Sequence, residues 1–496
     1  MRTKINLPVI GKAIGILITI EGIFLLLSLP FSVHYSNPDF SQVHLFHPGK
    51  DFWPMLLSSS LMMILGLIIT FLYRKAKTAL SKREGFIIVT FSWVVISVFG
   101  ALPFYLSGDI PSYTNAFFET MSGFTTTGAT ILNDIEAMPK GLLFWRSMTH
   151  WIGGMGIIVL SLAILPFFGI GGMSLFVAEV PGPTPDKLHP RITATAKRLW
   201  GIYVLLTFVE TLLLMAGGMN LFNGLTHAFG TMATGGFSPM NDSIAGFSPY
   251  IQYVIVVFMI FAGTNFTLHY LALHGRLREV FRNEEYRYFL TILGVFTLII
   301  TLSLVFNGHA GWEKSFRDSI FQVVSIVTTT GYITSDYLVW PGSLWVIIFM
   351  LMFIGGSAGS TGGGIKVMRQ LLIFKNSFLE LKRLVHPNAI IPVRFNQKTV
   401  GRNVIYNVLA FFVIYLIIFA LSIIVMTFMG LDFETSVGSV AASLGNIGPG
   451  IGGVGPVENY AAIPLVGKWF LSFLMLIGRL ELFTVLILLS PAFWKR

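Results

Sequence analysis

The stretch FFETMSGFTTTGAT at residues 117–130 decides the fold, because three related stretches follow it along the chain. They are LTHAFGTMATGGFSP (225–239), FQVVSIVTTTGYIT (321–334) and VGSVAASLGNIGPG (437–450). Each joins a short apolar segment to a turn rich in glycine, threonine or both. An apolar run of about 10–14 residues is too short to cross a bilayer and is typical of a re-entrant segment. Four ordinary surface loops are the alternative, but the shared pattern favours an internal repeat.

Longer apolar runs precede, separate and follow these stretches. A membrane helix needs about 20 mostly apolar residues. Ten runs of suitable length lie at residues 8–31, 54–73, 86–107, 143–168, 199–217, 250–273, 288–306, 342–374, 403–429 and 466–490. The chain is 54% hydrophobic and only 11% charged, whereas a soluble domain carries about 25% charged residues. The sequence therefore predicts an all-α polytopic membrane protein.

The four stretches predict a fourfold internal repeat. Aligning them brings Gly128, Gly235, Gly331 and Gly448 into register. In each, a span precedes a short pore helix and a filter loop, and a second span follows. Such repeats build one site at their common interface. The expected units are two extra N-terminal transmembrane helices at 1–80 and four repeats at 81–170, 190–280, 284–376 and 400–496.

Basic residues are divided unequally between the two sides of the expected membrane. The loops at Arg74–Arg83, 170–198, Arg276–Arg287 and Lys366–Arg402, together with both termini and with Lys12 counted in the N-terminal one, hold 26 of the 33 lysines and arginines. The opposite set holds 5 basic and 13 acidic residues, a net charge of 5 − 13 = −8. The positive-inside rule places the basic set, with both termini, in the cytoplasm. The net charge of +10 thus reflects topology, and no nucleic-acid partner is expected.

The glycine turns predict a path for a monovalent cation. Glycine adopts positive φ without steric cost, so successive carbonyls can point the same way. Rings of such carbonyls replace the water shell of a cation. No cluster of acids, which a divalent ion would favour, stands beside the four glycines. The candidate ion-binding residues are Thr126, Thr127, Gly128, Thr234, Gly235, Thr329, Thr330, Gly331, Asn446, Ile447 and Gly448.

The eighth apolar run is interrupted by GGSAGSTGGGIK at residues 355–366. A continuous helix is not expected there, because each glycine costs about 1 kcal/mol relative to alanine in a helix. Irregular backbone at membrane depth is tolerated only inside the protein or along a watery path. An intramembrane gate and a purely structural kink are the two interpretations of the segment. The candidate gate residues are Gly355, Gly356, Ser357, Gly359, Ser360, Thr361, Gly362, Gly363 and Gly364, with Arg479 from the last span.

These motifs resemble the TrkH/KtrB/HKT superfamily of potassium transporters, and its TrkH branch most closely. The resemblance rests on TTGAT (126–130), NIGPG (446–450), the two extra N-terminal spans and the final GRLELFTVLILLSPAFWKR (478–496). It implies a pseudo-fourfold pore within one subunit and a K+ filter in which one glycine per repeat dominates. It also implies a bacterial cytoplasmic membrane, a homodimer, and a cytosolic ring of nucleotide-binding, TrkA-like regulatory subunits. K+ is then the transported ion, and no organic cofactor is expected on this chain.

Three arginine and lysine residues lie within or near the spans. Arginine inside a membrane usually faces a cavity or a partner. The resemblance implies that Arg479 faces the pore beside the gating loop, where it repels cations or bonds to the loop carbonyls; a buried pair with Glu481, Glu210 or Glu21 is the alternative. Arg146 and Lys468 are more simply interpreted as anchors at the outer interface.

Other functions remain alternatives to a K+-selective channel-like uptake protein. The transport could be coupled to Na+ or H+. A secondary transporter of an organic solute would show inverted repeats, whereas the four repeats share one orientation. A membrane enzyme would need a paired nucleophile and base or a set of metal ligands, and the sequence contains no such group. We therefore expect no enzymatic activity.

Overall fold

The computed structural model describes residues 5–34, 48–76, 81–156, 192–342 and 344–495. Its helices up to the middle of the chain are α1 (Leu7–Leu26), α2 (Leu29–His34), α3 (Phe52–Leu72), α4 (Lys82–Gly100), α5 (Leu102–Leu106), α6 (Tyr113–Phe124), α7 (Lys140–Gly154), α10 (Ile192–Ala216), α11 (Leu221–Met232), α12 (Pro249–Ala262), α13 (Phe266–Leu273) and α14 (Leu277–Arg282). The later helices are α15 (Glu284–Phe306), α16 (Trp312–Val327), α17 (Leu344–Leu351), α18 (Val367–Val385), α19 (Arg402–Phe428), α20 (Phe433–Gly445), α21 (Leu465–Arg479), α22 (Phe483–Leu489) and α23 (Pro491–Trp494). Short 3₁₀ turns lie at Tyr337–Val339 and Gly452–Val454, and the strands β1 (Arg394–Phe395) and β2 (Lys398–Thr399) form an antiparallel hairpin.

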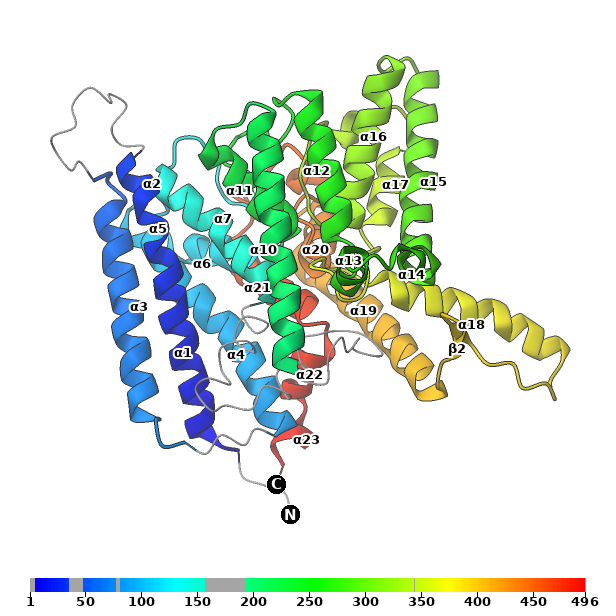
Figure 1. Cartoon of the computed structure of the whole chain (residues 1–496), viewed down its shortest axis with the longest axis horizontal. Helices are drawn as coiled ribbons and strands as arrows, with labels where there is room; N and C mark the ends of the chain where they lie inside the picture. Colours follow the sequence, from blue (N-terminus) through cyan, green and yellow to red (C-terminus); the bar gives the residue numbers. More distant parts are fainter. Residues whose placement is uncertain (1–4, 35–47, 77–80, 157–191, 343, 496) are drawn as a thin grey trace.

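Two helices stand apart at the N-terminal end, α1 and α3, and they pack along each other (Figure 1). Gly15 and Gly66 face each other across this contact, and a Cβ on either would lie within 3.0 Å of the other's carbonyl oxygen. The hydroxyl of Ser59 also donates to the carbonyl of Gly22 at 2.8 Å. Membrane helices associate through small residues and hydroxyl bonds of this kind, since lipid supplies no hydrophobic drive.

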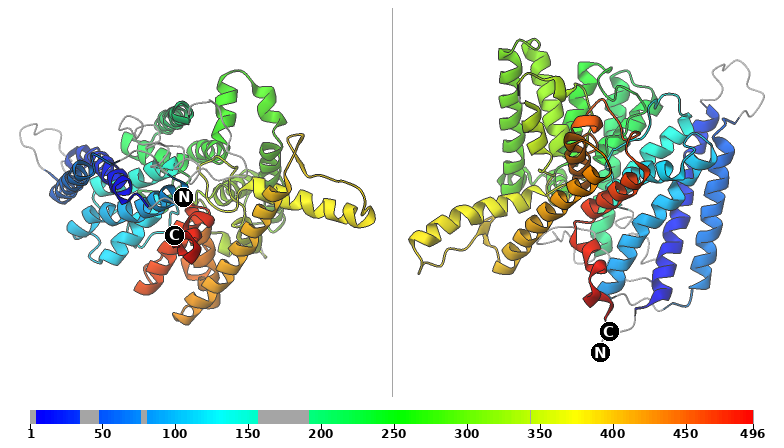
Figure 2. Two further views of the ribbon diagram at one scale, coloured as in Figure 1. Left: turned by 90° about the horizontal axis from the view of Figure 1, so that it is seen from below. Right: turned by 180° about the vertical axis from the view of Figure 1, so that it is seen from behind.

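The rest of the chain is built of four units, each a long helix, a short helix, a glycine turn and a second helix. The units are α4–α6–α7, α10–α11–α12, α15–α16–α17 and α19–α20–α21, and they gather around a common centre (Figures 1 and 2). The short helices have 12, 12, 16 and 13 residues, too few to cross a bilayer, which takes about 20. They therefore end inside the molecule, where the glycine turns begin.

The structure corrects two of the expected spans and confirms the break expected in a third. The runs 250–273 and 466–490 are each bent, by 103° between α12 and α13 and by 119° between α21 and α22. The run 342–374 is divided into α17 and α18 by irregular backbone at 352–366, as its glycines predict. Among the described residues, six helices are long and apolar enough to cross a membrane, or eight if each bent pair counts as one span.

A local backbone feature accompanies each of the two unexpected bends. At the first, the Asn265 side chain caps α13 by accepting from the amide of Thr267, as asparagine does at helix starts. At the second, Glu481 and Leu482 adopt φ of +53° and +52°, which no α-helix accommodates. The second half of the expected span 143–168, the end of the repeat expected at 81–170 and most of the 170–198 loop lie outside the described residues, as do the ends of both termini.

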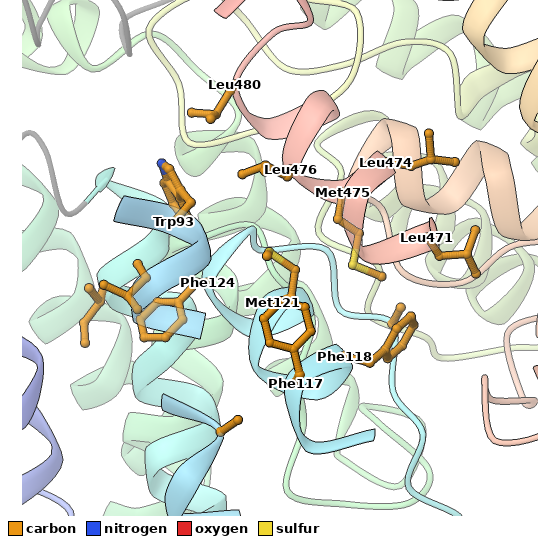
Figure 3. Packing of buried hydrophobic residues seen from close by; sticks show 14 of the residues in the cluster. Trp93, Phe117, Phe118, Met121, Phe124, Leu471, Leu474, Met475, Leu476 and Leu480 are labelled. Atoms are coloured by element: carbon orange, nitrogen blue, oxygen red, sulfur yellow. The ribbon is translucent and has the colours of Figure 1, made fainter. Parts of the chain in front are cut away.

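The first and fourth units share an apolar core (Figure 3). It joins Trp93 of α4 and Phe118 and Phe124 of α6 to Leu471 and Met475 of α21, all of them 2% exposed or less. Large apolar side chains also cover the outward faces of α3, α15 and α19, where they are exposed, as on Phe71, Leu298 and Leu421. Lipid tails are the medium in which such faces are stable. The chain is a multi-pass, all-α membrane protein.

Candidate ion pathway and its gate

Four turns of the same conformation follow the short helices α6, α11, α16 and α20. We call residues 126–128, 234–236, 329–331 and 446–448 the glycine turns. Each begins with a non-glycine residue in the left-handed region: φ is +51° at Thr126, +54° at Thr234, +60° at Thr329 and +53° at Asn446. Two residues later comes a glycine, with φ of +80°, +80°, +78° and +100° at Gly128, Gly236, Gly331 and Gly448. Non-glycine residues rarely adopt positive φ, so four occurrences at one place mark a repeated backbone.

This repeat changes the register of the second turn. The sequence alignment places Gly235 with the other three glycines, but Gly236 has the matching backbone conformation. Gly235 instead occupies the middle position, with Thr127, Thr330 and Ile447. The Thr-Gly dipeptides at 127–128, 234–235 and 330–331 favour Gly235 in the alignment and so conceal the role of Gly236. The spacing Thr-x-Gly, read from 126–128 and 329–331, would have identified it.

The glycine turns lie against one another in a closed order. A Cβ placed on Gly128 would overlap the carbonyl oxygen of Gly235 in the next turn. The same holds for Gly236 against Thr330 and for Gly331 against Ile447, and a Cβ on Gly448 would lie 2.8 Å from the carbonyl oxygen of Thr127. Carbonyl oxygens of all four middle residues are therefore packed between neighbouring turns. Only glycine fits at the third position, on grounds of both φ and space.

Side-chain oxygens accompany these carbonyls at the first position of each turn. The hydroxyl of Thr126 and the amide oxygen of Asn446 are buried and have no hydrogen-bond partner among the described residues. The hydroxyl of Thr234 donates to the Ala233 carbonyl at 2.6 Å, and that of Thr329 accepts from the amide of Gly363 at 2.7 Å. Buried polar atoms normally have partners. The described residues leave these two oxygens unsatisfied, and that of Asn446 lies toward Gly478 of α21.

A cavity opens on the other side of the turns and is lined by residues from all four units. Gly128, Gly236, Gly331 and Gly448 form its floor, and it encloses about 760 Å³ of empty space, partly open to solvent. A water molecule takes about 30 Å³, so the cavity has room for a hydrated cation. In the described residues no group of three or more His, Asp or Glu side chains could hold a metal ion. The neutral oxygen set favours a weakly hydrated monovalent cation over a divalent one.

A buried ion pair supports the rim of this cavity. Arg146 of α7 donates to Glu119 of α6 at 2.7 Å, and both side chains are at most 2% exposed. Glu119 also accepts from the hydroxyl of Thr130 and the amide of Ile131, just after the first glycine turn. Arg146 donates to the carbonyl of Ser238, just after the second turn, and its guanidinium lies 3.5 Å from the ring centroid of Phe237. The prediction of an interfacial anchor at Arg146 is therefore wrong.

Lys468 is also buried rather than interfacial. Its side chain is 3% exposed and donates to the side-chain oxygen of Asn115 at 2.9 Å and to the carbonyl of Ala461 at 3.0 Å. Because these partners belong to the first and fourth units, Lys468 ties the two units together. A sequence alone does not reveal this, since its partner Asn115 lies 353 positions away.

The loop at residues 355–364 lies beneath the glycine turns and is bonded to three of the four units. In the second unit, the hydroxyl of Thr361 donates to the Met232 carbonyl at 3.0 Å and the amide of Ser357 to the Gly263 carbonyl at 2.8 Å. In the third unit, Gly363 donates to Thr329 of the glycine turn itself. All the candidate gate residues of the loop are buried except Gly359 and Ser360, which are half-buried.

Glu285, which sequence reasoning missed, caps this loop from the start of α15. Its carboxylate accepts from the amide of Ala358 at 2.6 Å, and the residue is 4% exposed. A carboxylate that accepts a backbone amide forms one of the stronger hydrogen bonds in proteins. No local motif marks Glu285, because the amide that it binds lies 73 positions away.

Arg479 connects the loop to the first and fourth units. It is the last residue of α21 and donates to the carbonyl of Thr361 at 2.7 Å. A second nitrogen donates to the carbonyls of Gly153 and Gly154 at the end of α7, at 2.6 and 2.9 Å. The alternative of a pair with Glu481 is wrong, because Glu481 pairs with Arg369 of α18. Arg479 thus bonds to a loop carbonyl, one of the two interactions that the resemblance implies.

Known proteins resemble this chain over most of its length. A sequence model of the TrkH family, described as a cation transport protein, matches residues 55–496. The Trk system potassium uptake protein TrkH of Escherichia coli K12 is 44% identical over 428 residues, which are 85% of this chain and 88% of that protein. TrkH of Vibrio parahaemolyticus is 39% identical over 450 residues, 89% of this chain and 92% of that one. The crystal structure of the potassium transporter TrkH from Vibrio parahaemolyticus superimposes with a TM-score of 0.87 at 35% identity, covering 99% of this chain and all of that one.

Proposed function

Because the chain belongs to the TrkH family of cation transport proteins, we propose that it takes up potassium through a channel-like, K+-selective pore. The relatives that match most of its length are named as potassium uptake proteins of the Trk system. The family is one of transporters, not of enzymes. The transported ion is then K+, bound along its path by the residues of the glycine turns.

The closed order of the four glycine turns carries this proposal. Carbonyls of Thr127, Gly235, Thr330 and Ile447 are held between neighbouring turns. Each short helix ends just before its turn, so its negative C-terminal dipole is directed at the same centre. Rigid carbonyl rings of this kind replace the water shell of a cation without a formal charge. The filter is then formed by residues 126–128, 234–236, 329–331 and 446–448.

The 355–364 loop is the gate in this proposal, and its contacts fit a closed state. It lies directly below the filter, bonded to Thr329, and Arg479 holds it by the Thr361 carbonyl. These hydrogen bonds stabilise the blocked state, so they must break before ions pass.

The basic segments support a cytoplasmic position for the loops between units and for both termini. The membrane is then the bacterial cytoplasmic membrane, as the organisms of the relatives suggest. The name Trk system indicates several components for the relatives. We infer a homodimer and a TrkA-like, nucleotide-binding partner on the cytoplasmic side, where exposed basic residues such as Arg276, Arg402 and Lys398 offer a docking surface.

Tracer uptake into liposomes tests the function. Purified protein is reconstituted under an outward K+ gradient, and 86Rb+ uptake is measured with K+, Na+, Li+ or choline as competitor. We expect K+ to inhibit strongly and Na+ weakly. A variant that lacks three residues of the 355–364 loop is measured in parallel, because a closed gate alone would silence the intact protein. Silence of both proteins, or equal inhibition by Na+ and K+, would contradict the proposal.

A further inference from the structure

The turn between α21 and α22 carries two opposite charges that reach in different directions. Arg479 ends α21, and Glu481 lies two residues beyond it. Glu481 and Leu482 both have positive φ, and the chain bends by 119° at this point. Two successive non-glycine residues with positive φ are strained, and such strain persists only where the surroundings impose it. The residues packed against Glu481 and Leu482 therefore hold the turn in this conformation.

Glu481 forms an ion pair with Arg369, the third residue of α18. The two side chains are 9% and 10% exposed. The guanidinium of Arg369 also lies over the ring of Phe411 in α19, 4.0 Å from its centroid. Because both charges are removed from water, loss of either one leaves the other buried and unpaired. The pair therefore fixes the start of α18 against the turn.

The 355–364 loop is consequently held at two places by one turn. Arg479 holds the middle of the loop through the Thr361 carbonyl. Glu481 holds the helix into which the loop leads, because α18 begins at Val367, three residues after Gly364. We propose that Glu481 and Arg369 are positioning residues of the gate, and that their ion pair must open before the loop leaves the ion path. This inference rests on the proposed function, since it assumes that the loop is the gate.

The geometry of the pair is that of a contact that can break. A largely apolar groove, open to the surroundings of the protein, adjoins Arg369 between α19 and α22, with Phe411, Phe483 and Leu486 among its lining residues. The pair is also joined through one nitrogen and one oxygen, Nη2 and Oε2, while Nη1 of Arg369 and Oε1 of Glu481 have no partner. A one-point pair is weaker than a bidentate fork, as a contact that opens and closes requires.

Single substitutions and a charge reversal test the pair. Glu481→Gln and Arg369→Met should each raise basal 86Rb+ uptake by about tenfold, the factor for a shift of about 1.4 kcal/mol in the gate equilibrium. The K+ over Na+ preference should not change, because the filter is untouched. The double variant Arg369→Glu/Glu481→Arg should restore low basal uptake. Glu380→Gln, on the same helix but in an exposed pair with Arg383, should behave as the unmodified protein.

Cross-linking provides a second test that does not depend on how the charge variants fold. The chain contains no cysteine, so Arg369→Cys/Glu481→Cys introduces the only two thiols. A short bis-methanethiosulfonate reagent should lower uptake to the basal level, and a reducing agent should restore it. Uptake that the reagent leaves unchanged would overturn the inference.

The Arg479→Ala variant separates this inference from the proposed function. If it raises uptake and neither Glu481→Gln nor Arg369→Met does, the gate stands and the role of the pair is refuted. If the single variants raise uptake but the reversed pair does not restore it, the effect is structural and the pairing is refuted. If Arg479→Ala and the loop deletion both leave uptake unchanged, the gate itself is wrong.

Discussion

Asn446 donates its side-chain amide to the hydroxyl of Thr127 at 3.0 Å, across 319 positions of the chain. This bond joins the last glycine turn to the first. The same amide group donates to the carbonyl of Met475 in α21 at 2.9 Å. Threonine, which opens the other three turns, has one hydroxyl proton and could not donate twice. The departure of the fourth turn from Thr-x-Gly thus has a structural reason: its first residue closes the ring.

Replacing Asn446 by threonine should weaken the contact between the last glycine turn and the first. The variant keeps an oxygen near the path but loses the donor to Thr127 or to Met475. Each lost bond that leaves a buried acceptor unpaired costs about 1–3 kcal/mol. We expect a lower unfolding temperature in detergent and a weaker preference for K+ over Na+ in tracer competition. Ser443→Ala, a neighbouring buried substitution on α20, serves as control, and equal effects of the two changes would contradict the role of Asn446.

Gly236→Ser should lower the preference for K+ over Na+, although the sequence alignment points to Gly235 and not to Gly236. The added Cβ would overlap the Thr330 carbonyl, and φ of +80° is unfavourable for serine. Gly128→Ser and Gly331→Ser should act in the same way, with a lower K+/Na+ ratio in competition assays. An unchanged ratio in all three would refute the assignment of the filter.

Gly235→Ala should fail for a different reason, and a second substitution should repair it. Its backbone conformation accepts a side chain, as Thr127 and Thr330 show, but a Cβ there would overlap the imidazole of His150. Gly235→Ala should therefore weaken selectivity, and Gly235→Ala/His150→Ala should recover part of it. If removing the imidazole has no effect, steric exclusion by His150 is not the cause.

Arg479→Ala should raise basal 86Rb+ uptake by about tenfold, because bonds to Thr361, Gly153 and Gly154 are lost together. Arg479→Lys keeps the charge but has one compact ammonium, which cannot match the guanidinium fork. If uptake by Arg479→Lys lies between that of the unmodified protein and that of Arg479→Ala, hydrogen bonding contributes beside charge. Basal uptake in Arg479→Ala equal to that of the unmodified protein would count against the gate.

Thr329→Val should loosen the loop from the filter. The substitution removes the oxygen that accepts from the Gly363 amide at 2.7 Å and leaves that buried donor unpaired, at a cost of about 1–3 kcal/mol. We expect higher basal uptake, whereas Thr329→Ser, which keeps the hydroxyl, should stay near the original level. Equal uptake by the two variants would show that this bond does not hold the loop.

Arg146→Met should destabilise the protein, because Glu119 would remain buried without its partner. Breaking a buried ion pair in this way costs about 3–5 kcal/mol. The double variant Glu119→Gln/Arg146→Met should recover part of the loss in thermal unfolding, since no charge is left unpaired. If Glu119→Gln/Arg146→Met is less stable than Arg146→Met, the ion pair is not the main way in which these two residues stabilise the protein.

The sequence predicted the fold class well because the relevant signals are local. Apolar runs and short apolar segments mark the helices, and a density of glycine marks the break at 355–366; the structure and the relatives confirm an all-α membrane protein of the TrkH family. The bends after Ala262 and Arg479 escaped prediction, since their runs stay apolar throughout. The register of Gly235 and Gly236 also escaped, because two adjacent glycines differ in φ and not in composition.

Charged residues show the same limit more sharply. Nothing near Arg146 in the sequence reveals that Glu119 and the carbonyl of Ser238 surround it. Partners 27 and 92 positions away decide whether such a side chain lies at an interface or in the core. The roles of Glu285, Glu481 and Arg369 depend on contacts of the same long-range kind, which local patterns do not record.

The four glycine turns come from one chain and are not copies of each other. In an assembly of identical subunits, every substitution appears in all four turns at once. A change that is tolerated in one turn and harmful in another is therefore excluded. Here each turn is encoded separately. The fourth turn has an asparagine that bonds to the first turn, and the third unit, which contains Thr329, also contains the loop beneath the turns. A substitution can therefore change one of the four glycine turns while the other three keep their sequence.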